Sequence, residues 1–236
     1  MEGFIGELFG TMMLVILGDG VVGNVVLSRS KAQNSGWMVI CSGWAFAVMV
    51  GVFLALALGS PAHINPAVTI AMAVAGKFPW TQVPMFIIAQ TIGAFIAAII
   101  VWLHFLPHWS ETEDPGLKLC VFSTAPAIRS TGSNLTSEII GTVVLVIGVA
   151  AIFKGDVSAA LGPFLVASLV WGIGLSLGGT TGYAINPARD LGPRIAHAIL
   201  PIPGKGGSDF AYGWIPVVGP SIGALVAGFI IIGLGL

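Results

Sequence analysis

Long runs of apolar residues recur along the chain, and the charged residues lie mostly in the segments between them. A helix that crosses a bilayer needs about 20 mostly apolar residues. The pattern therefore predicts six membrane-spanning helices, at residues 3–28, 37–58, 80–103, 133–153, 157–177 and 211–236. The most polar stretch, 107–131, follows the third of these and is typical of an exposed loop.

Two further apolar stretches, 66–75 and 187–199, are too short to cross a bilayer. Apolar stretches of about 10–14 residues are usually re-entrant, interfacial or buried. Each one opens on a proline that follows an asparagine, at Asn65 and at Asn186. Proline suits the first turn of a helix, and the residue before it is biased out of the helical region. The sequence therefore predicts a short helix directly after each asparagine.

The two halves of the chain repeat one another. Three motifs recur in the same order: Glu7-Leu-Phe-Gly10-Thr11 as Glu138-Ile-Ile-Gly141-Thr142, Asn65-Pro-Ala as Asn186-Pro-Ala, and Gln90-Thr-Ile-Gly93-Ala94 as Pro220-Ser-Ile-Gly223-Ala224. We predict one domain, 1–236, with repeats at about 3–106 and 133–236 joined by 107–132. Each repeat holds three spans and one short helix. Because three is odd, the second repeat enters the membrane from the opposite side, as in many transport proteins.

The two short helices of such an inverted repeat enter the membrane from opposite faces and meet near its midplane. Non-helical backbone at that depth is tolerated only where it is buried in protein or lines a water-filled cavity. The repeat therefore predicts a passage at the point where the two short helices meet.

Composition supports a membrane protein. The chain is 56% hydrophobic and 8% charged, with a mean hydropathy of 0.99, whereas a soluble domain has about 25% charged residues. The net charge of −1 indicates no attraction to nucleic acid. Cys41 and Cys120 fall in no metal or redox spacing. No arrangement of nucleophile and base or of paired carboxylates stands out, so we expect neither an enzyme nor a metal or cofactor site.

Two Asn-Pro-Ala motifs, each opening a half-helix in a duplicated six-span chain, resemble the aquaporin superfamily over nearly the whole length. The motif residues are Asn65, Pro66, Ala67, Asn186, Pro187 and Ala188. Asp190, which follows Arg189, resembles the glycerol-facilitator branch, and Arg194 agrees with it. The resemblance implies an all-α membrane protein, a right-handed bundle of six transmembrane helices and two re-entrant half-helices. It also implies a homotetramer in the cell membrane, with both termini cytoplasmic.

The side-chain amides of Asn65 and Asn186 each offer two N–H donors. In the inverted repeat both would lie in the middle of the pore, where a passing hydroxyl group or water can bind them. Each asparagine could instead be an ordinary helix cap, and the two roles are compatible. The half-helix N-termini each carry about half a positive charge, which would repel cations from the point where they meet.

The resemblance implies a selectivity filter made by Arg189 together with Trp44, Gly174 and Tyr183. An arginine inside the membrane is expected to be functional, and its five donors can hold two adjacent hydroxyls. Gly174 stands where water-selective members have histidine, which predicts a wider opening with an apolar wall. Arg189 would bind the hydroxyl edge of a polyol and the aromatic rings its carbon edge. A surface arginine and a lipid-facing Trp44 are the alternatives.

Backbone carbonyls ahead of the two motifs are expected to complete the lining, at Ala62, His63, Ile64, Ala184 and Ile185. Glu7 and Glu138 occupy matching places in the repeat. A carboxylate in a span could relay protons. Repeat symmetry favours a structural role instead, in which each accepts N–H groups from its half-helix loop and holds the carbonyls toward the pore.

The predicted function is a passive channel for glycerol and other small neutral solutes, with water. A channel mainly for water, undissociated lactic acid or urea is an alternative within the same fold. An ion-coupled secondary transporter is an alternative of another class, but it would need ion-binding or titratable groups at the midplane, where Asn65 and Asn186 do not titrate.

The basic residues oppose the orientation that the resemblance implies. Lys77 and Lys154 fall on the inside. The outside receives Arg29, Lys31, Lys118, Arg129, Arg194 and Lys205. The positive-inside rule predicts the reverse.

Overall fold

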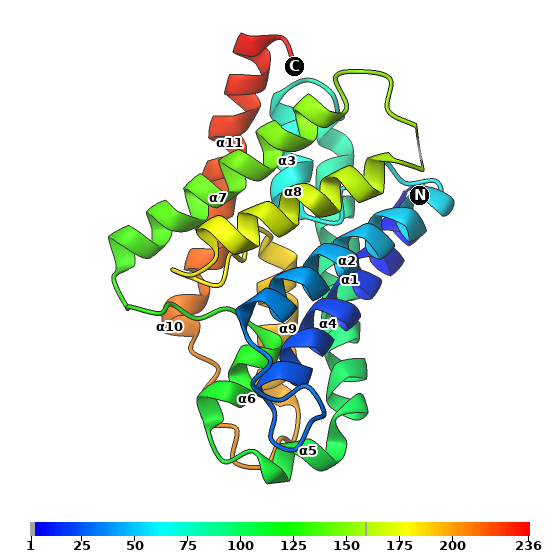
Figure 1. Cartoon of the computed structure of the whole chain (residues 1–236). Coiled ribbons are helices and arrows are strands. Elements are labelled where there is room, and N and C mark those ends of the chain that lie inside the picture. The colour runs from blue at the N-terminus through cyan, green and yellow to red at the C-terminus, as the bar shows by residue number, and fades with distance from the viewer. Residues whose placement is uncertain (1–2, 159) are drawn as a thin grey trace.

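The computed structural model describes residues 3–158 and 160–236 (Figure 1). The regular secondary structure of these residues is helical, with no strand. The helices are α1 Phe4–Val26, α2 Trp37–Ala57, α3 Pro66–Val74, η1 Trp80–Gln82, α4 Val83–His104, α5 Leu106–Glu111, α6 Pro115–Phe122, α7 Thr131–Ile152, α8 Gly162–Leu177, α9 Pro187–Ile199, α10 Phe210–Gly213 and α11 Ile215–Leu234. The short helices α3 and α9 begin where the sequence predicts.

Within the described residues, five helices are long and apolar enough to cross a membrane: α1, α2, η1 with α4, α7, and α10 with α11. The predicted fifth span, 157–177, contains residue 159, which lies outside the described residues. Its helix α8 begins only at Gly162 and has 16 residues. At 1.5 Å per residue α8 is about 24 Å long, shorter than the hydrocarbon core of about 30 Å. The prediction placed this helix correctly but began it too early.

Helix packing repeats between the two halves. Helix α1 packs against α2 and α4, and α7 packs against α8 and α11. The half-helices cross between the halves, because α3 packs against α11 and α9 packs against α4. Each half-helix is therefore held by a spanning helix of the other half.

The glycine of the third repeated motif lies at a helix crossing in both halves. A Cβ on Gly93 would lie 2.2 Å from the Leu8 carbonyl oxygen, and one on Gly223 would lie 2.8 Å from the Ile139 carbonyl oxygen. Leu8 and Ile139 occupy the same place in the first motif. Small residues allow backbones to approach closely, so the same close crossing is built twice.

The prediction of an exposed loop at 107–131 is wrong. This segment contains α5 and α6, and Trp109 and Phe122 from it are buried, with ring centroids 5.5 Å apart. Pro107 and Pro115 are typical of loops, but here they lie in the first turns of α5 and α6. Asp114 caps α6, since its side chain accepts from the Gly116 N–H at 2.7 Å. Asp114 and the two prolines, which favoured a loop, are thus helix-start residues.

Candidate functional site

Both asparagines of the Asn-Pro-Ala motifs cap their half-helices. The Oδ1 atom of Asn65 accepts from the Ala67 N–H at 2.8 Å. The Oδ1 atom of Asn186 accepts from the N–H groups of Ala188 and Arg189, at 3.1 and 3.3 Å. These bonds satisfy donors at the helix start and fix the direction in which each side-chain amide points.

The same two amides join the halves of the molecule. The Nδ2 atom of Asn65 donates to the Ile185 carbonyl at 2.8 Å, and Nδ2 of Asn186 donates to the Ile64 carbonyl at 2.9 Å. The half-helix tips therefore abut. Each Nδ2 carries two hydrogens, and no second acceptor for either amide is present in the described part of the chain. One N–H of each asparagine is left for a solute.

The backbone before each motif is strained in the same pattern. Ala62 and Ile64 have φ of 58° and 43°, and Tyr183 and Ile185 have φ of 40° and 42°. A β-branched residue rarely adopts the left-handed region, so these isoleucines must be held there by their surroundings.

Carbonyl oxygens in these strained segments are available to a solute. Those of Ala62, His63 and Ala184 accept no hydrogen bond from any described residue. The carbonyls of Ile64 and Ile185 are already engaged by the two asparagines.

Glu7 holds the first strained segment in place. Its carboxylate accepts from the backbone N–H groups of His63 at 2.9 Å and Ile64 at 2.6 Å. It also accepts from the hydroxyl of Ser60 at 2.5 Å and the amide of Gln90 at 2.7 Å. With four donors around it, this fully buried carboxylate is a fixed acceptor.

Glu138 makes the corresponding contacts in the second half. It accepts from the backbone N–H groups of Ala184 at 3.0 Å and Ile185 at 2.8 Å, and from the Thr181 hydroxyl at 2.7 Å. Gly141 leaves room for the Ile185 side chain, because a Cβ there would lie 2.9 Å from its Cγ2 atom. Each loop is thus held by a carboxylate from the first helix of its own half.

A cavity of about 420 Å³ lies along the two half-helix tips. Its polar side chains include Asn65, Asn186 and Arg189, and most of its wall is apolar, with side chains from α2, α3, α7 and α8. The sequence-predicted residues that line it are Trp44, Ala62, His63, Ile64, Asn65, Tyr183, Ala184, Ile185, Asn186 and Arg189.

Arg189 stacks on Trp44 at the edge of this cavity. Its guanidinium carbon lies 4.1 Å from the centroid of the Trp44 ring, within the range of a cation–π interaction. The Trp44 ring in turn packs on Gly18, where a Cβ would lie 2.3 Å from it. The Nη1 atom of Arg189 is buried, and no described residue accepts a hydrogen bond from it. The guanidinium is thus positioned by packing and keeps its donors.

Gly174 is not among the residues that line the cavity. A Cβ on Gly174 would lie 2.9 Å from both Cζ and Oη of Tyr183, and 3.1 Å from the sulfur of Cys41. The sequence analysis predicted that the missing side chain of Gly174 widens the opening of the filter. Tyr183 instead fills the space beside Gly174. Its hydroxyl oxygen is buried beside Gly174, so the ring, and not the hydroxyl, faces the cavity.

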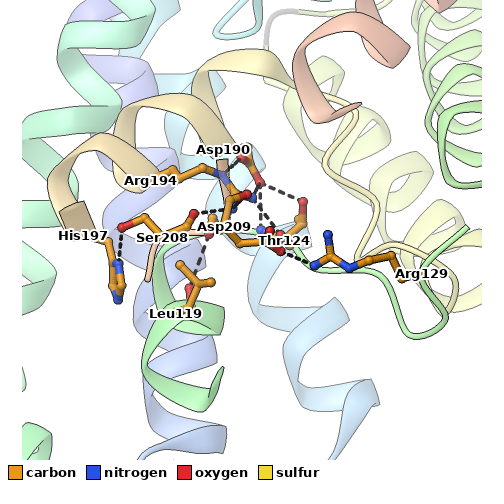
Figure 2. A network of polar contacts seen from close by, with 9 residues as sticks. Leu119, Thr124, Arg129, Asp190, Arg194, His197, Ser208 and Asp209 are labelled. Atoms are coloured by element: carbon orange, nitrogen blue, oxygen red, sulfur yellow. Dashed lines mark hydrogen bonds and ion pairs between the residues drawn. The ribbon is translucent and has the colours of Figure 1, made fainter. Parts of the chain in front are cut away.

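Asp190 and Arg194 form a buried ion pair away from the cavity (Figure 2). The Oδ1 atom of Asp190 accepts from Nε of Arg194 at 2.7 Å. Asp190 also accepts from the backbone and hydroxyl of Thr124, and Arg194 donates to the carbonyls of Thr124, Ser208 and Asp209. The pair ties α9 to the segment after α6 and to the segment before α10.

Sequence reasoning missed the hydroxyl partners of the two glutamates. Ser60 and Thr181 each stand five residues before an Asn-Pro-Ala asparagine. A hydroxyl residue at matching places in both repeats was the signal that could have found them. Gln90 carries no such signal, because the repeat places Pro220 at the matching position. Thr124 and Ser208 carry none either, because their contacts with the Asp190–Arg194 pair are visible only in three dimensions. No cluster of three metal-ligating side chains occurs in the ranges that the structure describes.

Comparisons with known proteins identify the family of the chain. Residues 1–231 match the model of a family described as major intrinsic protein. A probable glycerol uptake facilitator protein of Thermotoga maritima is 58% identical and aligns over 96% of both chains. The glycerol uptake facilitator protein of Bacillus subtilis is 54% identical over 97% of this chain and 83% of its own.

A solved structure has the same fold. The X-ray structure of the aquaglyceroporin from Plasmodium falciparum superposes with a TM-score of 0.86 at 29% identity, covering 97% of this chain and 94% of its own. The matched family model spans nearly all of the sequence, and the two relatives, both above half identity, align over 96% and 97% of this chain. The chain belongs to the major intrinsic protein family.

Proposed function

We propose that the protein is a passive membrane channel for glycerol and other small neutral polyols, and that it also passes water. The observation that carries this proposal is the cavity in which Asn65, Asn186 and Arg189 are set into a mainly apolar wall. A polyol has hydroxyls along one edge and C–H groups along the other, so it matches such a wall. The names of the Thermotoga and Bacillus relatives support the same solute.

A polyol loses its water shell in the cavity and must replace those hydrogen bonds. Arg189 donates to two adjacent hydroxyls, and the free N–H of each asparagine donates to a hydroxyl passing the half-helix tips. The carbonyls of Ala62, His63 and Ala184 accept in return. Because every hydroxyl both donates and accepts, the solute exchanges one set of partners for the next without a large barrier.

Cations are excluded by the same tips. Two half-helix N-termini meet at the cross-linked asparagines, and each carries roughly half a positive charge. Arg189 adds a full positive charge beside the cavity. A cation would lose its hydration where the local field opposes it, whereas a neutral solute is unaffected.

We also propose a homotetramer in the cell membrane, with one pore per subunit and both termini in the cytoplasm. Large apolar side chains are exposed on the outside of the helices, among them Phe46, Ile88, Phe164 and Phe229. Such a surface suits lipid or neighbouring subunits. Residues 1–236 would form a single channel domain of two repeats.

The test is solute flux into liposomes that contain the purified protein. Vesicles are mixed with hyperosmotic glycerol or hyperosmotic sorbitol in a stopped-flow instrument, and their volume is followed by light scattering. We expect fast volume recovery in glycerol and none in sorbitol. Recovery in glycerol no faster than in empty liposomes would overturn the proposal.

Two further measurements separate the alternatives. Urea and lactic acid at low pH are compared with glycerol in the same liposomes, and a faster recovery for either would favour a different physiological solute. Glycerol flux is then repeated after the proton and sodium gradients are dissipated. A passive channel is unaffected, whereas loss of flux would indicate an ion-coupled transporter.

A further inference from the structure

The ring of Tyr183 lines the cavity, yet no hydrogen bond fixes its direction. Its hydroxyl oxygen is buried and has no partner among the described residues. Asn65 and Asn186, by contrast, are each fixed by hydrogen bonds from both the oxygen and the nitrogen of the amide. The position of the tyrosine ring therefore depends on the groups that pack against it.

Helix α8 and the residue after it form one side of the site of this ring. A Cβ on Gly174 would lie 2.9 Å from Cζ and Oη of Tyr183, and one on Gly178 would lie 2.5 Å from its Cδ1 atom. The two glycines are about one helical turn apart, so the ring lies along this face. Neither glycine lines the cavity. The face gives the ring room, but the two glycines have no side chain that would keep it in place.

Trp37, the first residue of α2, supplies such a side chain. Its ring centroid lies 5.8 Å from that of Tyr183, with the planes at 80°, which is a favourable edge-to-face geometry. The same indole donates from Nε1 to the Gly174 carbonyl at 3.1 Å. A Cβ on Gly178 would lie 2.8 Å from Cζ2 of Trp37 as well. One indole thus joins α2 to α8 and contacts the tyrosine ring at the same point.

The alternative role for Trp37 is that of a tryptophan at the membrane interface. It is 40% exposed and begins a spanning helix, and tryptophans are enriched at such positions. An interfacial tryptophan keeps its polar end in the wet region. The N–H of Trp37 instead donates to a backbone carbonyl of another helix, so the protein orients the indole.

We propose that Trp37 is a positioning and specificity-determining residue of the filter, an inference that rests on the proposed conduction of polyols. Its indole does not line the cavity itself but braces the Tyr183 ring, which does. This contact sets how broad a solute can pass. Without the indole, the tyrosine ring can withdraw from the passage.

The experiment compares two triols of different breadth in liposomes. Glycerol is unbranched, whereas trimethylolethane carries three hydroxymethyl groups and a methyl group on one carbon. Both offer three hydroxyls, so the ratio of their fluxes reports breadth. In Trp37→Ala we expect the flux of trimethylolethane relative to glycerol to rise on the order of tenfold, the lower end of the discrimination that an apolar pocket exerts on one extra methylene group.

Trp80→Ala is the matched control. Trp80 is 56% exposed in η1 and does not line the cavity, so its loss should leave the flux ratio at the wild-type value. An unchanged ratio in Trp37→Ala, or the same rise in both variants, would overturn the inference. If Trp37→Ala does not assemble, Trp37→Phe decides. That variant lacks the N–H donor and has a smaller ring, so a ratio above wild type supports the inference and the wild-type ratio contradicts it.

A second measurement does not depend on conduction. The chain has two tyrosines, so isotope-labelled tyrosine gives few ring signals in detergent, and Tyr212→Phe assigns them. We expect Trp37→Ala to lower the NMR order parameter of the Tyr183 ring and to leave that of Tyr212 unchanged. Equal order of Tyr183 in wild type and Trp37→Ala would refute the positioning role. If wild type fails to conduct glycerol, the proposed function fails, and the order parameters still decide whether Trp37 holds Tyr183.

Discussion

At the scale of single residues, the sequence located the positions of the candidate site better than it described the space around them. The Asn-Pro-Ala motifs, Arg189 and the two glutamates carry local or repeated patterns, and the structure brings them together. Gly174 is different. Its effect depends on which neighbour fills the space of the missing side chain, and Tyr183 does so from the loop that follows α8. No spacing rule in the sequence contains that information.

Gly174→Ala should therefore narrow the passage by moving Tyr183. The new methyl group would lie 2.9 Å from the tyrosine ring, so the ring must shift toward the cavity. We expect glycerol flux to fall several-fold and water flux to fall less, since glycerol is the wider solute. Stopped-flow measurement of both solutes checks this.

The control lies on the same helix. A Cβ on Gly172 meets nothing within 4 Å, so Gly172→Ala should leave both fluxes unchanged. Equal fluxes in wild type and Gly174→Ala would show that Tyr183 does not move into the passage.

Glu138→Gln should disturb the second strained segment. A glutamine has one acceptor oxygen in place of two, so it cannot accept from Thr181, Ala184 and Ile185 together. Each lost bond to a charged acceptor is worth about 1.5–3 kcal/mol. We expect glycerol and water flux to fall together, because both solutes would donate hydrogen bonds to the backbone carbonyls of this segment.

Glu111→Gln provides the comparison, because Glu111 is partly exposed and pairs with exposed Arg29. Its flux should match wild type. A Glu138→Gln channel with undiminished flux would show that the carboxylate does not hold the carbonyls.

At the scale of elements, hydrophobic patterning found the spanning helices because lipid is the solvent around most of them. It failed where an element is held by protein contacts. Helices α5 and α6 lie in the segment that was predicted to be a loop, yet Trp109 and Phe122 are buried in one cluster with Val101 of α4 and Ala196 of α9. Helix α8 starts late because Ala160 and Leu161, directly before Gly162, form a turn and not a helical turn.

Asp190→Asn should loosen the joint between α9 and its neighbouring segments. Asp190 and Arg194 are fully buried, and removing one member of a buried ion pair costs about 3–5 kcal/mol. We expect a lower midpoint of thermal unfolding in detergent, with Arg194 left uncompensated.

Arg129→Gln is the contrasting variant. Arg129 forms an ion pair with Asp209 at the exposed end of the same network (Figure 2), where solvent screens the charges. Its unfolding midpoint should stay close to that of wild type. Similar shifts for both variants would argue against a special role for the buried pair.

At the scale of the whole molecule, the structure accounts for most of the basic residues that oppose the expected orientation. Arg29 pairs with Glu111, Arg129 with Asp209 and Arg194 with Asp190. Lys118 donates to the Pro203 carbonyl. Lys205 donates to the carbonyls of His197, Ala198 and Leu200 at the end of α9, where a cation is favourable. These charges stabilise folded loops and helix ends, which a count of loop charges ignores.

Both ends of the chain should therefore face the cytoplasm in spite of the charge count. Figure 1 shows the beginning of α1 and the end of α11 at the end of the molecule away from α5 and α6. Reporter domains fused to either terminus should both be active only in the cytoplasm. Opposite results for the two fusions would exclude an even number of crossings.

The reciprocal hydrogen bonds at the half-helix tips have a consequence for the evolutionary origin of the two repeats. Asn65 reaches Ile185 and Asn186 reaches Ile64, which is the self-complementary contact of a two-fold symmetric pair. A half-length ancestor could have made the same contact only with a second copy of itself, lying upside down in the bilayer. Gene fusion would then have converted this contact between two separate antiparallel copies into a contact within one chain. The two repeats, expressed today as separate polypeptides, should accordingly be inactive alone and regain flux when produced together.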